Sequence, residues 1–385
     1  MEARLNHRSR LAGDDVIDLY TALSAHARPA GSVAETVARS ECRAWLERDG
    51  FEVSETPFSY SAWPGLCATP ILGALLMLVS AFAAISVLGS RAANDAIGHS
   101  DGVMASSSAA VALIAVAGIL VGRFGTSRLH WMRRTSTILQ ARRGEPAVWL
   151  MAHLDSKSQP VSLLTRATGS VAFTISWIGA LGAWAISHFF SNATFCLVGL
   201  LAACAVSAVP LVLSWVGSNG NGALDNASGV ATVLAAARGW PRDVPVGVVI
   251  TSGEELGLAG ARAWAAGRPR HDGGIAINCD GVDDVGAVTV TLGRRRARRG
   301  KWDWGSSDVT KACGPDVRVR RVLPGVLLDA VALTDAGWAA CTVSKGGLRS
   351  LARVHTRRDT IARTSGSGIA ETAQKIVSLG GAIIA

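Results

Sequence analysis

Five short clusters of acidic and histidine side chains lie at or near the ends of apolar stretches in this sequence. They are Ala152-His-Leu-Asp-Ser156, Gly222-Ala-Leu-Asp-Asn-Ala-Ser-Gly229, Thr251-Ser-Gly-Glu-Glu-Leu-Gly257, Ile277-Asn-Cys-Asp-Gly281 and Val354-His-Thr-Arg-Arg-Asp359. Imidazole nitrogens and carboxylate oxygens without thiolates suit Zn²⁺ first, with Mn²⁺ or Co²⁺ as alternatives. The clusters therefore predict a site for two adjacent ions whose ligands are His153, Asp225, Glu255, Asp280 and His355.

Glu254 is the additional acid of this set. Two adjacent glutamates repel each other unless a cation or a proton lies between them. One of them binding metal while Glu254 acts as general base on a water molecule would resolve that conflict. Each cluster also has an ordinary alternative: His153 in a loop, Asp225 as a helix N-cap, and Glu254 and Glu255 in a solvated turn.

Strands that alternate with helices must position these clusters. The apolar runs 136–141, 147–152, 244–251, 274–278 and 285–292 are typical of strands, as is the alternating run 51–60. Helical periodicity covers 14–27, 32–48, 226–239, 256–266 and 366–384. This order predicts an α/β fold with a central mixed, mostly parallel sheet and helices on both faces. Such sheets place their sites at the carboxyl ends of the strands, where the clusters lie.

Four further segments are long and apolar enough to span a bilayer, which takes about 20 apolar residues. They are 69–89, 103–122, 167–187 and 193–216, and none contains a charged side chain. The alternative is a set of four buried core helices, which would normally carry a polar stripe. The composition, with 49% hydrophobic and 17% charged residues, favours membrane spans.

The four spans pair as two hairpins with short turns at 90–102 and 188–192. We expect hairpins 69–122 and 167–216 to interrupt one catalytic domain made of 1–66, 123–161 and 217–385. Residues 123–166 carry eight basic side chains and the two turns carry one, Arg91. The excess of basic residues predicts an integral membrane protein of the cell membrane whose catalytic domain faces the cytoplasm.

The remaining composition excludes several other classes of site and partner. The seven cysteines are scattered without C-x-x-C spacing, which predicts free thiols rather than disulfides or a thiolate metal site. The polar start Met1-Glu-Ala-Arg is not typical of a cleavable signal peptide. The basic run Arg294–Arg299 is a solvated loop or a contact with anionic headgroups, and no nucleic-acid recognition motif accompanies it. Trp302 and Trp304 are core residues, interfacial anchors or part of a pocket wall.

Taken together and in order, the clusters resemble metallopeptidase family 28, the co-catalytic two-zinc aminopeptidases. The resemblance extends to Arg28-Pro-Ala-Gly-Ser32 and to Ser136-Thr-Ile-Leu-Gln-Ala-Arg-Arg-Gly144, so it covers nearly all of the chain outside the apolar segments. It implies a peptide substrate, which next to the bilayer would naturally be hydrophobic or membrane-associated.

The resemblance also implies roles for individual residues. One ion would be held by His153, Asp225 and Asp280, and the other by Asp225, Glu255 and His355, so that Asp225 bridges. Asp155 would orient His153, and Glu254 would move a proton from the attacking water to the leaving amine. The Asp225–Asn226 peptide resembles one that is often cis in this family.

The sequence departs from the family pattern in three ways. His153 and Asp225 lie 72 residues apart because the second hairpin intervenes, where relatives have about a dozen. The S-D-H triplet of the family appears as Leu327-Leu-Asp-Ala330 without its histidine. His153-Leu-Asp-Ser-Lys157 also resembles glutaminyl cyclases of the same fold group. A single-zinc cyclase-like acyltransferase and a non-catalytic binding protein therefore stay open beside the aminopeptidase.

Overall fold

The computed structural model describes residues 13–92, 96–190, 192–268, 275–293, 306–323 and 325–384. The basic run Arg294–Arg299, Trp302 and Trp304 lie outside these residues. The described chain divides into two compact units. The first contains the described parts of Met1–Ala62, Thr126–Ser158 and Gly217–Ala385, and the second contains Trp63–Gly125 and Gln159–Val216. The first unit carries all five clusters.

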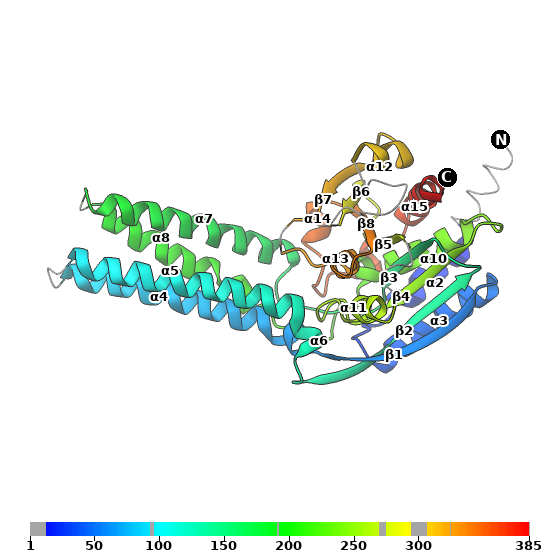
Figure 1. The fold of residues 1–385 in the computed structure, drawn as a ribbon, viewed down its shortest axis with the longest axis horizontal. Coiled ribbons are helices and arrows are strands. Elements are labelled where there is room, and N and C mark those ends of the chain that lie inside the picture. Colours follow the sequence, from blue (N-terminus) through cyan, green and yellow to red (C-terminus); the bar gives the residue numbers. More distant parts are fainter. Residues whose placement is uncertain are drawn as a thin grey trace. The chain divides into compact units, whose positions relative to one another are not determined.

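One eight-stranded sheet forms the centre of the first unit, in the order β1-β2-β4-β3-β5-β8-β6-β7 (Figure 1). The strands are β1 (Glu52–Ser61), β2 (Arg133–Arg143), β3 (Val148–His153), β4 (Val246–Thr251), β5 (Ile275–Val282), β6 (Ala287–Leu292), β7 (Arg318–Arg321) and β8 (Ala339–Gly346). The four central strands β4, β3, β5 and β8 run parallel to one another. The pairs β1–β2, β2–β4 and β6–β8 are antiparallel, and β7 runs parallel to β6. The mixed, mostly parallel sheet expected from the sequence is confirmed.

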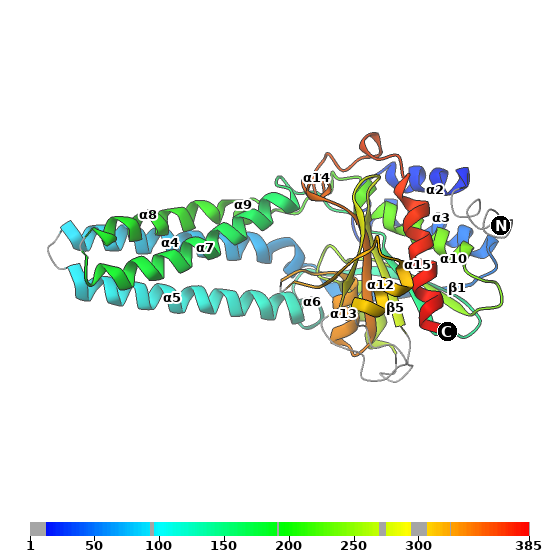
Figure 2. The same cartoon turned by 90° about the horizontal axis from the view of Figure 1, so that it is seen from above.

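Helices cover both faces of this sheet, as the view from above shows (Figure 2). On one face lie α2 (Asp14–Ser24), α3 (Val33–Arg48), α10 (Ser228–Gly239), α12 (Ser306–Cys313) and α15 (Gly368–Ile384). On the other lie α11 (Ala259–Ala266) and α13 (Asp329–Asp335). Side chains of β3 alternate between these faces, with Leu150 packed in the first core and Trp149 and Met151 in the second.

Several elements were not predicted from the sequence. Among them are β7, β8, α12, α13 and the short helices α6 (Thr126–Arg128) and α14 (Leu348–Leu351). Strand β8 is central, paired with β5 and β6, and all of its residues except Ser344 and Gly346 are buried. Its run Ala339-Ala-Cys-Thr-Val contains small residues in place of large apolar ones, and this weakens the strand pattern.

The second unit consists mainly of long apolar helices that run side by side (Figures 1 and 2). They are α4 (Thr69–Ala92), α5 (Ala96–Leu120), α7 (Leu163–Ser187) and α8 (Ala193–Ser207), followed by the short α9 (Val209–Val212). The last predicted span was too long, because the helical stretch ends at Val212 rather than at residue 216. Pro210, which lacks an amide donor, lies in α9 after the break at Ala208.

Four helices of the described chain are long and apolar enough to cross a membrane. At most 28% of the most apolar stretch in each is buried. Large apolar side chains such as Phe82, Ile85 and Leu113 are more than 60% exposed. Other described parts of the chain therefore leave much of the surface of these helices uncovered.

Two adjacent glycines of α15 provide a test of the packing between α15 and the segment after α10. A Cβ on Gly380 would lie 2.1 Å from Cη2 of the buried Trp240, whereas a Cβ on Gly381 would have no described atom within 4 Å. Gly380→Ala should lower the free energy of unfolding by about 1–3 kcal/mol through overpacking. Gly381→Ala should leave it unchanged or raise it by about 0.5–1 kcal/mol, since alanine favours helix. Denaturant unfolding of the purified protein measures both, and equal effects of the two substitutions would contradict the packing described.

Candidate metal centre

The five predicted ligands and the predicted general base Glu254 meet at one edge of the sheet. His153 is the last residue of β3, and Glu254 and Glu255 follow the end of β4. Because β3, β4 and β5 are parallel, their carboxyl ends lie together. Asp280 lies near the end of β5, at an irregularity of register between Cys279 and Val282. The last two residues come from connecting segments, Asp225 from the turn before α10 and His355 from the segment after α14.

The side chains form two groups. Ligand atoms of His153, Glu254 and Asp280 lie within 4.8 Å of one another, and so do those of Asp225, Glu255 and His355. The two oxygens of Asp225 face different histidines, with Oδ1 3.2 Å from Nε2 of His153 and Oδ2 3.0 Å from Nε2 of His355. Asp225 thus connects the two groups, as a bridging ligand must. The Asp225–Asn226 peptide is cis, as the resemblance implied.

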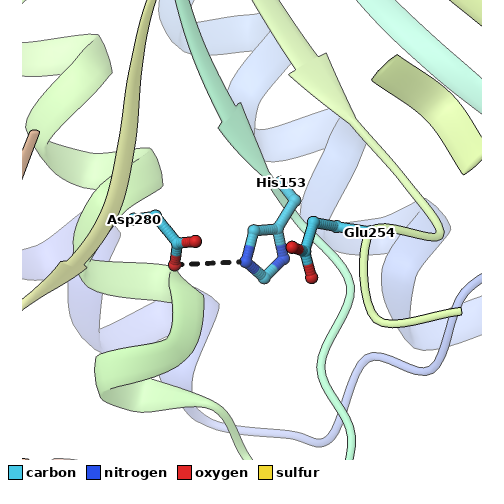
Figure 3. Close-up of side chains that lie close together, drawn as sticks. All are labelled: His153, Glu254 and Asp280. Atoms are coloured by element: carbon cyan, nitrogen blue, oxygen red, sulfur yellow. Dashed lines mark ion pairs between the residues drawn. The ribbon is translucent and has the colours of Figure 1, made fainter. Parts of the chain in front are cut away.

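Glu254 belongs to the first group (Figure 3). The imidazole of His153 lies between Glu254 and Asp280, whose Oδ1 is 3.5 Å from Nε2 of His153. Burial, helped by the charges of Glu255 and Asp280, raises the pKa of Glu254 well above its ordinary value, although His153 acts in the opposite direction. A carboxylate in this position has the high proton affinity that a general base requires.

The donor atoms of the centre fit divalent cations. Nε2 of His153 is buried within 3.5 Å of two carboxylate oxygens, yet it has no hydrogen-bond partner among the described residues. The buried oxygen Oε1 of Glu255 also has no hydrogen-bond partner among the described residues. Buried polar atoms are rarely left without partners unless an ion or a water satisfies them. Two nitrogen donors and several carboxylates without thiolate match the preferences of zinc.

Two further carboxylates hold the backbone of the candidate ligands. Asp155 accepts hydrogen bonds from the amides of Glu254 and Glu255, both at 3.2 Å. Asp359 does the same for Leu224 at 2.7 Å and Asp225 at 3.0 Å. The nearest acceptor for Nδ1 of His153 is the backbone oxygen of Asp155 at 3.1 Å, whereas the Asp155 carboxylate is 3.7 Å away. The sequence suggested no role for Asp359, although it ends the H-T-x-x-D motif.

Arg28 connects the two segments that the second apolar hairpin separates in sequence. Its buried guanidinium donates to the backbone oxygens of Leu154 (2.9 Å), Asn221 (2.7 Å) and Gly222 (3.0 Å). Two backbone hydrogen bonds between Ser158 and Gly217 join the same segments at the points where the hairpin leaves and returns. His153 and Asp225 are therefore brought together despite 72 intervening positions.

Two charged residues of the centre were missed from the sequence. Nζ of Lys157 lies 2.6 Å from Oε2 of Glu255, and the H-L-D-S-K pattern was the only signal for it. Asp329 is fully buried at the start of α13 and accepts a hydrogen bond of 2.6 Å from Oγ1 of Thr251. Burial raises the pKa of Asp329 to about 7. This aspartate belongs to the Leu327-Leu-Asp-Ala330 stretch, which replaces the family triplet.

Asp359 should be needed to keep Asp225 in place. Removing its carboxylate leaves two buried amides without acceptors, and loss of such outer partners typically weakens metal binding about 10–100-fold. We expect Asp359→Ala to lose zinc at chelator concentrations that leave the unaltered protein loaded, as measured by elemental analysis after dialysis. Asp316→Ala, which removes an exposed carboxylate paired with Lys375, serves as the control. Equal zinc retention in both variants would exclude this role.

Solved structures of other proteins share this fold. An aminopeptidase from Aneurinibacillus sp. strain AM-1 is 14% identical, with a TM-score of 0.53 over 97% of this chain and 94% of that one. The peptidase M28 precursor from Shewanella amazonensis SB2B is 16% identical, with a TM-score of 0.54 over 98% and 95%. The glutaminyl cyclase from Fimbriiglobus ruber is 14% identical, with a TM-score of 0.52 over 96% and 94%. At these identities the likeness shows the fold alone.

The sequence comparison is more specific. No curated protein sequence matches the chain significantly. The model of peptidase family M28, however, matches residues 136–379, which include every candidate ligand. That match covers more than half of the 385 residues, and its residues form a plausible two-metal centre on a zinc-aminopeptidase fold. The chain therefore belongs to peptidase family M28, and it is a zinc-dependent metallopeptidase.

Proposed function

We propose that this metallopeptidase is an integral membrane aminopeptidase that removes N-terminal residues from peptides. The observation that carries the proposal is the position of Asp225, which faces His153 with one oxygen and His355 with the other. This arrangement suits two ions that act together on one peptide bond. The exopeptidase reaction is further supported by the family match and by the fold shared with aminopeptidases.

The proposed ligands use the two groups, with Asp225 shared between them and Glu254 kept as the base. His153, Asp225 and Asp280 would hold one Zn²⁺, and Asp225, Glu255 and His355 would hold the other. When bound, the two ions supply Lewis acidity that polarises the peptide carbonyl and acidifies a water molecule. Asp155 and Asp359 fix the backbone that carries Glu254, Glu255 and Asp225.

Glu254 performs the proton transfer. Its carboxylate takes a proton from water as the water oxygen attacks the carbonyl carbon. It gives this proton to the amine nitrogen when the carbon–nitrogen bond breaks, so the products are a free amino acid and a shortened peptide. The high proton affinity of the buried Glu254 favours the first transfer, in which the carboxylate takes the proton from water.

We further propose that hairpins 69–122 and 167–216 span the membrane and that the catalytic part, 1–66, 123–161 and 217–385, lies at its cytoplasmic face. The four long apolar helices and their exposed apolar side chains support the spans. The basic residues between the hairpins support the orientation. Because the second hairpin lies between His153 and Asp225 in sequence, hydrophobic or membrane-associated peptides are the proposed substrates.

A glutaminyl-cyclase-like acyltransferase is the second candidate function. It is favoured by the H-L-D-S-K pattern at His153–Lys157 and by the shared fold with a glutaminyl cyclase. The products distinguish the two reactions. A peptidase shortens a peptide with N-terminal glutamine by one residue, whereas a cyclase keeps its length and releases ammonia.

Glu254→Gln should abolish hydrolysis while leaving zinc bound. Loss of a general base typically lowers the rate by about 10²–10⁴-fold. The test is digestion of a peptide library by the purified, zinc-loaded protein, read by mass spectrometry together with the zinc content. Unchanged hydrolysis in the variant would sink the assignment of Glu254, and no hydrolysis by either protein would favour a binding protein.

The membrane proposal predicts that the protein stays in the membrane pellet after alkaline carbonate washing. A C-terminal tag should resist protease added outside sealed right-side-out vesicles and become sensitive once they are permeabilised. A tag inserted at 188–192 should show the opposite protection. Release by carbonate would exclude membrane spans, and reversed protection would exclude the proposed orientation.

A further inference from the structure

Lys157 is a buried cation inside the second ligand group. Its Nζ lies 2.6 Å from Oε2 of Glu255, and the two side chains are 11% and 4% exposed. Nε2 of His355 is 3.3 Å from the same carboxylate oxygen. The lysine is therefore in contact with a proposed metal ligand. It is not part of the proton transfer assigned to Glu254.

The backbone around Lys157 aims this side chain into the centre. The amide of Ser156 donates to Arg28, and Ser158 pairs with Gly217 through two backbone hydrogen bonds. The chain also passes so close that a Cβ on Gly220 would lie 2.4 Å from the backbone oxygen of Lys157. Because both neighbours are anchored, the backbone of Lys157 is fixed beside the centre, and its buried side chain reaches Glu255 from there.

The first ligand group has no comparable cation. Within the described residues, neither Asp280 nor Asp225 has a lysine or arginine nitrogen within 4.0 Å, and the ion pairs of both are with histidine. The positive charge of Lys157, 2.6 Å from Oε2 of Glu255, already compensates this carboxylate. A divalent ion at the second group must compete with this charge for the same carboxylate.

We propose that Lys157 is an internal counter-ion that weakens binding of the second metal ion. The two metal positions then fill unequally, and Lys157 must leave Glu255 when an ion binds to Asp225, Glu255 and His355. This inference rests on the proposed two-metal function. It assigns the difference in affinity between the positions to one residue of this chain.

Zinc titration of the full-length protein tests the proposal. The metal-free protein is equilibrated with chelator-buffered zinc, and bound zinc per chain is measured by elemental analysis. The unaltered protein should fill in two separate steps. In Lys157→Met, which keeps most of the side-chain length without its charge, the second step should shift to about tenfold or more lower free zinc, within the usual range of coupling between sites. The first step should shift much less.

Two further variants serve as controls. Lys157→Arg keeps the charge and should keep the weak second step. Lys375→Met removes a lysine that pairs with Asp316 outside the centre, and it should titrate like the unaltered protein. A second step that is unchanged in Lys157→Met would overturn the proposal. If that variant does not fold, Lys157→Gln replaces it, and two equal steps in the unaltered protein would overturn the proposal by themselves.

The titration separates this proposal from the aminopeptidase assignment. Zinc binding is measured without substrate, so failure of the Lys157 proposal leaves the peptidase reaction untouched. A protein that binds two zinc ions in unequal steps governed by Lys157 but releases no amino acid from any peptide would instead contradict the proposed function.

Discussion

Repulsion between buried carboxylates is the constraint around which this centre is built. Asp225, Glu254, Glu255 and Asp280 converge at one sheet edge, where water cannot screen them. Such a set persists only with compensating positive charge, which imidazoles and Lys157 supply in part and divalent ions would complete. The excess negative charge of the centre therefore favours the binding of cations. Its geometry keeps the like-charged carboxylates apart.

Backbone amides compensate the remaining carboxylates of the site. Asp155 and Asp359 each accept hydrogen bonds from two consecutive backbone amides. These amides belong to the turns that carry the candidate ligands, and they stabilise the negative charge of the two carboxylates. The same hydrogen bonds offset the cost of burying these two carboxylates and fix the positions of the ligands. Holding the ligands before an ion arrives reduces the ordering that metal binding would otherwise require.

Much of this arrangement could be predicted from the sequence, because strand ends and ligand chemistry are both local signals. His153 and Glu255 follow strongly apolar strands, and parallel strands bring such ends together. The contact of Lys157 with Glu255 could not be predicted, because side-chain direction depends on the tertiary path around Arg28 and Gly220. The central strand β8 was missed since its small residues give a weak periodic signal.

The apolar hairpins leave the catalytic fold intact because each begins and ends next to residues of the first unit that pair with each other. The first lies between β1 and β2 in sequence, and the pairing of these strands continues to Ser61 opposite Arg133. The second leaves after Ser158 and returns at Gly217, and these two residues hydrogen-bond to each other. An insertion whose ends are already joined adds little closure entropy, whatever its length. His153 and Asp225 can therefore contact each other in the centre despite their long separation in sequence. The buried Arg28 stabilises this contact, because it donates hydrogen bonds to the segments that carry both residues.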